Sequence, residues 1–389
     1  MILHFLLDEK ITDQVIANFE SVSKKNKFLV FSKTQKPLKH IKTENQNIFV
    51  YDFEEQDINE VLNKIKPNGI ILHAYHLEFA KTLLNIKHNV KVAWVAWGFD
   101  IYGLPKIKPL TYAPLTDSFL RSTSFFLETK RMILANDLYR KIFFFLLRKE
   151  DRYTLIFKSL DKVDYFTTYL AEDYSYFSKY YPNDMDFIKC TFTSIDQYLG
   201  GNKDISITSV ASNILIGNSN TPESNHLDVM IKLKNLQQDS MSVFVPLSYG
   251  ENRKYKSTVL EKGKSLFGKN FRPLLDFMEK GEYLKILRTC ATGIFYHYRQ
   301  QAMGNIIAML FMGARIYMYG DSPGYKYLVR HQVAVYDFDR DYVRYKNNPL
   351  PQKLAEKNRK VLEELFSDTK VKDQLKNLIN LMILKNNLD

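Results

Sequence analysis

The stretch GIFYHYRQQAMGN, residues 293–305, guides the interpretation of the whole chain. It begins as an apolar, aromatic run typical of a buried strand. It then turns polar at Arg299-Gln300-Gln301 and continues as a helical pattern of apolar residues. A helix that opens with Gly304 and Asn305 after such a turn forms a common anion site, because helix N–H groups and a guanidinium both favour phosphate. A surface arginine followed by helix-capping glutamines would give the same pattern, so both interpretations stay open.

The composition describes a folded protein with an anionic partner. A length of 389 residues favours two domains, and 45% hydrophobic with 25% charged residues excludes a disordered chain. The net charge of +12 points to nucleic acid, a phospholipid surface or a phosphorylated small molecule. Cys190 and Cys290 lie far apart, which favours a reducing compartment. The first ten residues predict a strand rather than a signal peptide, and the apolar run at 142–147 is too short to span a bilayer.

The first hundred residues alternate between short apolar runs and helical patterns. This alternation predicts a parallel sheet wrapped by helices, with strands at 2–7, 28–31, 48–51, 69–73 and 90–96. Open sheets of this kind bind ligands at the carboxyl ends of their strands, where His76 and Asp100 lie in this sequence. Asp100 suits either a turn cap or a general base. His76 suits a polar cleft residue or a structural histidine, because no third ligand at metal spacing accompanies it.

Residues 105–162 break the alternation with a basic and aromatic segment. Between 121 and 158 nine Lys or Arg stand against four Asp or Glu, around the run KIFFFLLRK. Three consecutive phenylalanines cannot all face one side of a helix. The segment therefore favours a helix that lies on an anionic bilayer surface. Single-stranded nucleic acid, or an ordinary helix with a phenylalanine core, are the alternatives.

The second half of the chain repeats the strand–helix alternation. A linker rich in glycine around Gly200 and Gly201 predicts a boundary there. We expect three parts: an N-terminal domain at 1–200 that contains the insert, a nucleotide-sugar domain at 201–349, and a helical tail at 350–389. In the second part the turn Gly217-Asn218-Ser219 follows a strand and suits a phosphate, although it is not a Walker loop or a dinucleotide fingerprint.

Four blocks carry a family resemblance. They are WGFDIY at 97–102, ILIGNS at 214–219, VPLSYG at 245–250 and RQQAMG at 299–304. In this order they resemble the bacterial 4-acetamido-4,6-dideoxygalactosyltransferases of enterobacterial common antigen assembly. The resemblance implies a GT-B glycosyltransferase: α/β, with two Rossmann-like domains facing across a cleft. It also implies transfer of an amino-deoxysugar of the Fuc4NAc type from a dTDP donor to a polyprenyl-diphosphate-linked saccharide, in synthesis of a cell-envelope polysaccharide.

The resemblance also implies roles for single residues. The donor diphosphate would lie against the Gly217–Ser219 turn, Arg299 would neutralise the leaving group, and Asp100, with His76 in reserve, would act as general base from the facing domain. The remaining donor ligands would be Tyr249, Gln300, Gln301, Gly304 and Asn305.

The sequence also supports predictions about metal binding, cellular location and alternative functions. The pairs Asp184/Asp186 and Asp337/Asp339 match the Asp-x-Asp metal motif by spacing, but we interpret both as caps or turns and expect neither a metal nor another cofactor. The enzyme would work as a peripheral protein on the cytoplasmic face of the inner membrane, without nucleic acid. A basic nucleic-acid-binding protein, or a transferase that uses a UDP-sugar, remain alternatives.

Overall fold

The computed structural model describes residues 1–389 except 34–37, 44, 124, 235–240, 251 and 385–389. The chain forms two compact units. Unit 1 comprises Met1–Leu104, Ile133–Phe192 and Thr369–Asp389, and unit 2 comprises Pro105–Met132 and Thr193–Asp368. This division differs from the expected ranges, because the boundary falls at 192/193 and both the insert and the tail are shared between the units.

Unit 1 is built on a seven-stranded parallel sheet. Its strand order is β3-β2-β1-β4-β5-β6-β7, so β1 pairs with β2 on one side and with β4 on the other. The central strands are short, apolar and buried, as expected of a parallel sheet covered on both faces. The strands are β1 (Ile2–Leu7), β2 (Asn26–Phe31), β3 (Ile48–Tyr51), β4 (Gly69–His73), β5 (Lys91–Val95), β6 (Tyr165–Thr168) and β7 (Asp186–Lys189).

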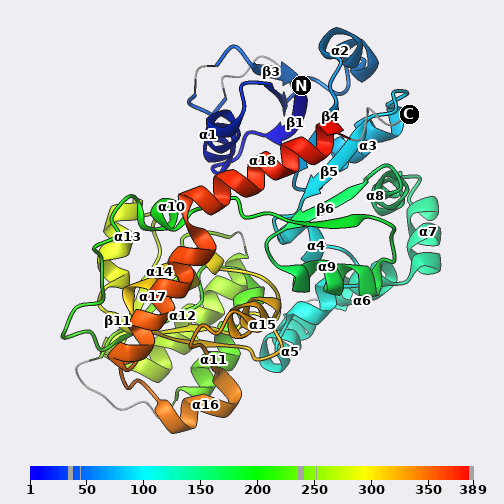
Figure 1. Ribbon diagram of the computed structural model, residues 1–389. Coiled ribbons are helices and arrows are strands. Elements are labelled where there is room, and N and C mark those ends of the chain that lie inside the picture. Colours follow the sequence, from blue (N-terminus) through cyan, green and yellow to red (C-terminus); the bar gives the residue numbers. More distant parts are fainter. Residues whose placement is uncertain (34–37, 44, 124, 235–240, 251, 385–389) are drawn as a thin grey trace. The chain divides into compact units, whose positions relative to one another are not determined.

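The late helix α18 (Asp368–Leu384) belongs to the core of unit 1. Its Leu375, Leu378 and Met382 share one buried cluster with Ile2, and Figure 1 shows α18 beside β1 and β4. A Cβ at Gly69 would lie 2.6 Å from Met382 Cε and 3.0 Å from Met382 Cβ, so α18 packs closely against β4 at this position. The other helices of the unit are α1 (Thr12–Val22), α2 (Ile58–Ile65), α3 (Leu77–Asn85), α4 (Phe99–Tyr102), α7 (Asp137–Leu146), α8 (Arg152–Leu160) and α9 (Ala171–Tyr180).

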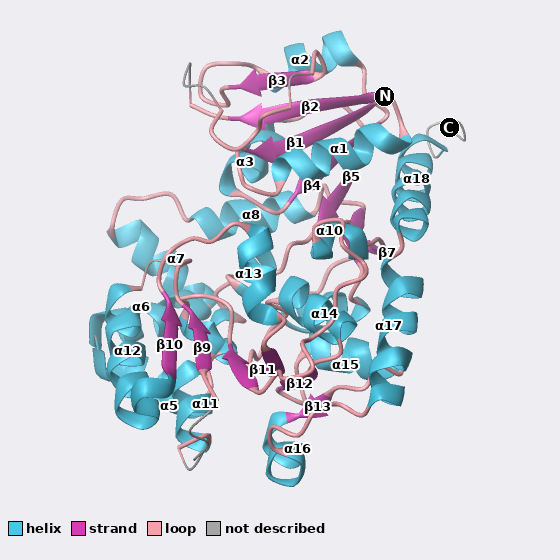
Figure 2. Ribbon diagram, turned by 90° about the vertical axis from the view of Figure 1, so that its left-hand side faces the viewer, coloured by secondary structure: helices cyan, strands magenta, loops and turns pink. Residues whose placement is uncertain are grey.

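Unit 2 contains a six-stranded parallel sheet in the order β10-β9-β8-β11-β12-β13, and helices surround its strands (Figure 2). The strands are β8 (Asn213–Ile216), β9 (Val243–Pro246), β10 (Phe271–Leu274), β11 (Cys290–Phe295), β12 (Arg315–Met318) and β13 (Tyr336–Asp337). The α-helices are α5 (Pro114–Thr123), α10 (Ile195–Leu199), α11 (His226–Lys232), α12 (Arg253–Phe267), α13 (Lys280–Leu287), α14 (Met303–Met312), α15 (Pro323–Arg330), α16 (Phe338–Tyr345) and α17 (Gln352–Phe366). Helix α6 (Phe125–Ala135) spans the 132/133 boundary between the units.

The stretch at 293–305 has the expected strand–turn–helix structure. Strand β11 ends at Phe295, and α14 begins at Met303, one residue before the predicted Gly304. Eight of the ten residues of α14 are buried, which explains why its sequence is apolar on every side.

Both sheets have the strand order of a Rossmann fold, which confirms the predicted fold class for each unit. The chain builds outward from a central first strand and then returns to its other side with the fourth strand. At this reversal the connections leave in opposite directions, and a crevice opens at the carboxyl ends of the two strands. In unit 2 these strands are β8 and β11, so the loops that follow them are the first place to look for a ligand site.

Candidate functional site

The turn after β8 lies directly beside β11. The backbone N–H of Gly217 donates to the carbonyl of Ile294 over 2.9 Å. Gly217 has φ +64°, and a Cβ on it would lie 2.6 Å from Nε2 of His226, so the close approach of this histidine requires a glycine. The predicted Gly217–Ser219 turn is therefore tied both to the neighbouring strand and to the start of α11.

Gln301 joins the loop after β11 to the loop after β8. Its Nε2 lies 2.8 Å from Oδ1 of Asn218 and 3.3 Å from the hydroxyl oxygens of Ser219 and Thr221. An amide nitrogen has two hydrogens, so these acceptors share them, and the short contact to Asn218 dominates. The buried Oε1 of Gln301 has no partner among the residues that the structure describes. Two blocks that lie 82 residues apart in the sequence thus form one polar cluster.

Two buried histidines lie in the same crevice. His297 follows β11 and is 2% exposed, and His226 is fully buried at the start of α11. Burial lowers the pKa of His226 to about 3. Burial also lowers the pKa of His297 well below its usual value, and the charge of Arg299 acts in the same direction. Both rings are therefore neutral at pH 7. Within the described part of the chain, Nε2 of His226 and both ring nitrogens of His297 have no hydrogen-bond partner.

Cationic side chains border this cluster. Arg299 donates from Nη1 to the carbonyl of Gln300 over 3.2 Å. Lys108 forms an ion pair with Glu223, a carboxylate that is 4% exposed. Burial lowers the pKa of Lys108 to about 8, and the positive charge of Arg299 acts in the same direction. Burial raises the pKa of Tyr112 to about 12, and the positive charge of Arg299 acts on this pKa in the opposite direction. Lys108, Tyr112 and Arg299 are therefore electrostatic neighbours.

Lys108 reaches the crevice because residues 105–132, here called the strap, are bound to unit 2. Buried Asn225 accepts from the N–H of Ala113 over 2.8 Å, and buried Asp228 accepts from the N–H groups of Leu115 and Thr116 over 2.8 and 3.0 Å. Asp228 thereby satisfies the first turn of α5, whose N–H groups have no partners within the helix. The sequence contains no local signal for these contacts, which is why Lys108 was not predicted.

The remaining predicted donor ligands divide into two groups. The Tyr249 carbonyl accepts from the N–H of Asn220 over 2.5 Å, which places the Tyr249 turn beside the Gly217 loop with its side chain 68% exposed. Asn305 instead donates to the Tyr283 hydroxyl over 3.0 Å, and a Cβ on Gly304 would meet the ring of Tyr198. Gly304 and Asn305 thus contact α10 and α13 rather than the turn after β8.

In unit 1 the Asp100 side chain braces two loops. It is buried and accepts from Nε1 of Trp94 over 2.7 Å and from the N–H groups of Tyr75 and Trp97 over 3.0 Å each. Burial raises the pKa of Asp100 to about 6, which these hydrogen bonds oppose. The carboxylate thereby connects the loops after β4 and β5. Its role as a base stays a prediction.

His76 lies at the N-cap of α3, in contact with an exposed aromatic ring. Its ring centroid is 5.7 Å from that of Phe99, which is 45% exposed. Burial lowers the pKa of His76, so the ring is neutral at pH 7 and can accept a proton. The general-base role of His76 also stays a prediction.

Helix α7 presents its apolar residues to solvent and its arginine to the interior. Leu138, Ile142, Phe145 and Leu146 recur at helical spacing and are exposed, with Phe145 at 81%. Arg140 is 2% exposed and pairs with Asp137 and Asp151 at 2.5 and 2.9 Å. This arrangement is the inverse of an ordinary surface helix. Among the described helices, none combines the length and the apolar character needed to cross a bilayer.

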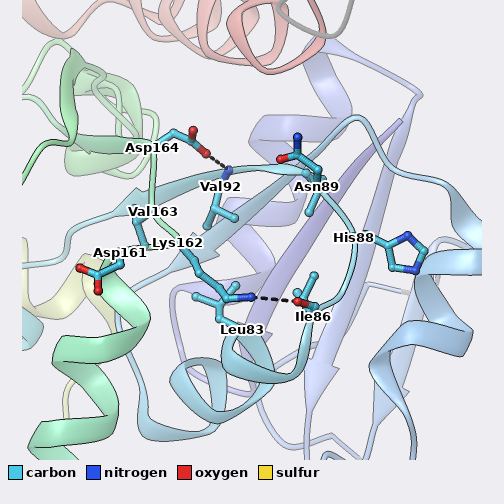
Figure 3. A pocket seen from close by; sticks show the side chains of 10 residues that line it. Leu83, Ile86, His88, Asn89, Val92, Asp161, Lys162, Val163 and Asp164 are labelled. Carbon is cyan, nitrogen blue, oxygen red and sulfur yellow. Dashed lines mark hydrogen bonds between the residues drawn. The ribbon is translucent and has the colours of Figure 1, made fainter. Parts of the chain in front are cut away.

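Two further features lie outside the crevice. A cavity of about 280 Å³ lies at the amino ends of β5 and β6 (Figure 3), where Lys162 donates to the Ile86 carbonyl and Asp164 accepts from the Val92 N–H. It contains none of the predicted residues. Asp337 accepts from the N–H of Asp339 and caps α16, the role expected for it.

A family profile and solved structures match this chain. The profile described as 4-alpha-L-fucosyltransferase, glycosyl transferase group 56, matches residues 133–367, more than half of the chain. A sucrose-phosphate synthase from Thermosynechococcus elongatus has a TM-score of 0.64 at 9% identity, and covers 99% of both chains. A glycosyltransferase from Rickettsia africae ESF-5 has a TM-score of 0.63 at 11% identity, with the same coverage.

A third solved structure, described as trehalose-6-phosphate from E. coli bound with UDP-2-fluoro glucose, also has a TM-score of 0.63 at 11% identity. It covers 98% of this chain and 99% of its own. At such low identities these likenesses concern the fold alone, and that fold is the GT-B type of glycosyltransferases.

Proposed function

Because the chain belongs to the 4-alpha-L-fucosyltransferase family, glycosyl transferase group 56, it is a glycosyltransferase, and we propose that its donor is a dTDP-linked amino-deoxysugar of the Fuc4NAc type. The proposed acceptor is a polyprenyl-diphosphate-linked saccharide at the cytoplasmic face of the inner membrane, in cell-envelope polysaccharide synthesis. The observation that carries the donor assignment is the crevice between β8 and β11. There, buried polar atoms that have no partner among the described residues lie near Arg299.

The crevice offers what a sugar diphosphate needs. Buried polar groups are nearly always hydrogen-bonded, so Nε2 of His226, both ring nitrogens of His297 and Oε1 of Gln301, which have no partner among the described residues, suit bonds to a ligand. Neutral imidazoles can each donate one hydrogen bond and accept another, which fits sugar hydroxyls as well as phosphate oxygens. The guanidinium of Arg299 adds charge, and α14 starts directly after Gln301 and Ala302 without a side-chain cap, so its N-terminal N–H groups favour an anion.

The proposed step is a single glycosyl transfer. An acceptor hydroxyl oxygen forms a bond to C1 of the donor sugar, while the bond between C1 and the phosphate oxygen breaks. The electron pair leaves on the nucleoside diphosphate, whose growing charge Arg299 stabilises. The hydroxyl proton passes to a base, for which Asp100 and His76 are the candidates. No step requires a metal, and we propose that the enzyme is metal-independent.

The exposed stripe of α7 supports membrane-surface binding. Lys141 lies within this helix, and Arg148 and Lys149 follow it directly. Apolar side chains bounded by cations are what an anionic bilayer surface binds, at about 1 kcal/mol for each basic residue near the surface. A lipid-linked acceptor would be reached from that surface without a spanning helix.

Two alternatives remain distinguishable from this proposal. A UDP-sugar donor has the support of the E. coli structure with UDP-2-fluoro glucose, which shares the fold. A nucleic-acid partner rests on the charge of +12 and the content of phenylalanine and tyrosine, and it gains nothing from the family assignment. An oligonucleotide filter-binding assay at physiological salt tests it.

The decisive test is a thermal-shift titration against dTDP, UDP, GDP and CMP, with and without EDTA. We expect stabilisation by dTDP that EDTA does not change and that Arg299→Ala removes. Arg330→Ala, in the last turn of α15, is the matched control and should respond like the wild type. Stabilisation by UDP instead would change the donor assignment. Stabilisation that Arg299→Ala leaves unchanged would move the site elsewhere, and no response to any nucleotide would contradict the proposed donor site.

A further inference from the structure

We propose that Lys108, on the strap, is a second cationic ligand of the donor diphosphate, and that Glu223 holds it in place until the donor binds. This inference rests on the proposed function and adds to it a residue from outside the nucleotide-sugar domain predicted at 201–349.

The strap is anchored next to Glu223 by the same loop. Asn225 ends the 3-10 turn Pro222–Ser224 that contains Glu223, and its side chain accepts from the N–H of Ala113 over 2.8 Å. Its Nδ2 also donates to the carbonyl of Tyr296, over 2.9 Å, at the end of β11. One fully buried side chain therefore connects the strap, the Glu223 turn and the β11 loop. Lys108 is held at a defined place and does not simply extend into solvent.

Glu223 places the Lys108 ammonium at the edge of the polar cluster. The next residue, Ser224, has its hydroxyl oxygen 3.5 Å from both the Ser219 hydroxyl and Nε2 of Gln301. Ser219 and Gln301 are among the residues proposed to bind the donor diphosphate. The ammonium is also 5.6 Å from the centre of the Tyr112 ring. The flexible stem of Lys108 would let its ammonium turn from Glu223 towards a bound diphosphate.

The local charges favour an anionic ligand. Lys108 and Arg299 influence each other electrostatically, and burial together with Arg299 lowers the pKa of Lys108 to about 8. Lys108 pairs with the buried carboxylate of Glu223, and Tyr112 is neutral because burial raises its pKa to about 12. A diphosphate bound beside Lys108 and Arg299 would be attracted by both cations. In the free enzyme the Glu223 carboxylate would hold the Lys108 side chain in place, and Lys108 would keep its positive charge.

Calorimetric titration of the full-length protein with dTDP, dTMP and thymidine tests this inference. Lys108→Met keeps the length of the side chain and removes its charge. We expect affinity for dTDP to fall roughly 10- to 100-fold, the worth of a charged hydrogen bond, with thymidine binding unchanged. Lys108→Arg should restore most of the affinity. Glu223→Gln should bind dTDP several-fold more tightly, because the competing carboxylate is removed. Lys203→Met, which breaks the exposed Lys203–Asp196 pair, is the matched control.

The outcomes separate the two proposals. If wild type binds dTDP and Lys108→Met binds it equally well, the inference is wrong and the donor site stands. If the ion pair only fastens the strap, Lys108→Met and Glu223→Gln should both lower the thermal stability and leave the ratio of dTDP to thymidine affinity unchanged. This result would also overturn the inference. If the wild type prefers UDP, the same series with UMP and uridine applies. If no nucleoside diphosphate binds, both proposals fail together.

Discussion

The exposed stripe of α7 gives a prediction whose size follows from the structure. Replacing Phe145 and Leu146 together by serine should weaken binding to anionic vesicles. Full burial of a leucine or phenylalanine side chain is worth about 1.5–3 kcal/mol. If the interface buries each only partly, the pair contributes roughly 2 kcal/mol, which is about a 30-fold loss of affinity. Because both side chains are already mostly exposed, at 81% and 72%, folding stability should change by less than about 0.5 kcal/mol.

Co-sedimentation with vesicles rich in phosphatidylglycerol measures this effect, and thermal unfolding checks that the variant is folded. Phe277→Ser is the matched control, because Phe277 is also mostly exposed, at 68%, but lies outside the insert. It should bind vesicles like the wild type. Rising salt should weaken wild-type binding, since Lys141, Arg148 and Lys149 contribute through charge. A folded double variant that sediments with vesicles as the wild type does would refute the role of α7.

Two further substitutions test the loops at the strand ends. Gly217→Ala should lower the free energy of unfolding by about 1–3 kcal/mol in chemical denaturation, because alanine is strained at φ +64° and its Cβ would meet His226. Unchanged stability and unchanged dTDP affinity would contradict the close contact between the Gly217 turn and His226. Asp100→Asn should cost about 1–3 kcal/mol, because one amide oxygen cannot accept from three N–H groups. Burial raises the pKa of Asp100 from its usual 3.8 to about 6, so the folded protein keeps a proton that the unfolded chain releases. As the pH rises from about 4 to 6, the free energy of unfolding of the wild type should therefore fall relative to that of Asp100→Asn. Equal pH profiles of the two proteins would contradict this.

Local sequence patterns predicted most of the strands. The apolar runs at 2–7 and 69–73 coincide with β1 and β4, and the run at 90–96 contains β5. The family resemblance implied that the turn at 217–219 and Arg299 bind one diphosphate. In the structure the two loops meet because the ends of adjacent parallel strands lie at one edge of the sheet. The hydrophobic periodicity and the strand order therefore account for the crevice between β8 and β11.

Contacts between distant residues account for what the sequence did not predict. The strap looked continuous with the insert, but Asn225 and Asp228 bind its backbone from more than a hundred residues away. The pairing of Lys108 with Glu223 has the same origin. His297 could have been noticed, because it lies within the quoted stretch directly after a strand. Asn305 was predicted to bind the donor because it lies at the start of a helix. In the structure the Asn305 side chain donates a hydrogen bond to the Tyr283 hydroxyl on α13.

The way in which the chain alternates between its units bears on how the protein is made. The polypeptide passes from one unit to the other four times, at 104/105, 132/133, 192/193 and 368/369. On the ribosome, Ile2 and Phe19 emerge early, whereas Leu378 and Met382, which complete their core, emerge more than 350 residues later. Until then the nascent sheet exposes an apolar face. Unit 1 therefore cannot finish folding until α18 has been synthesised, and its early strands must avoid aggregation until then.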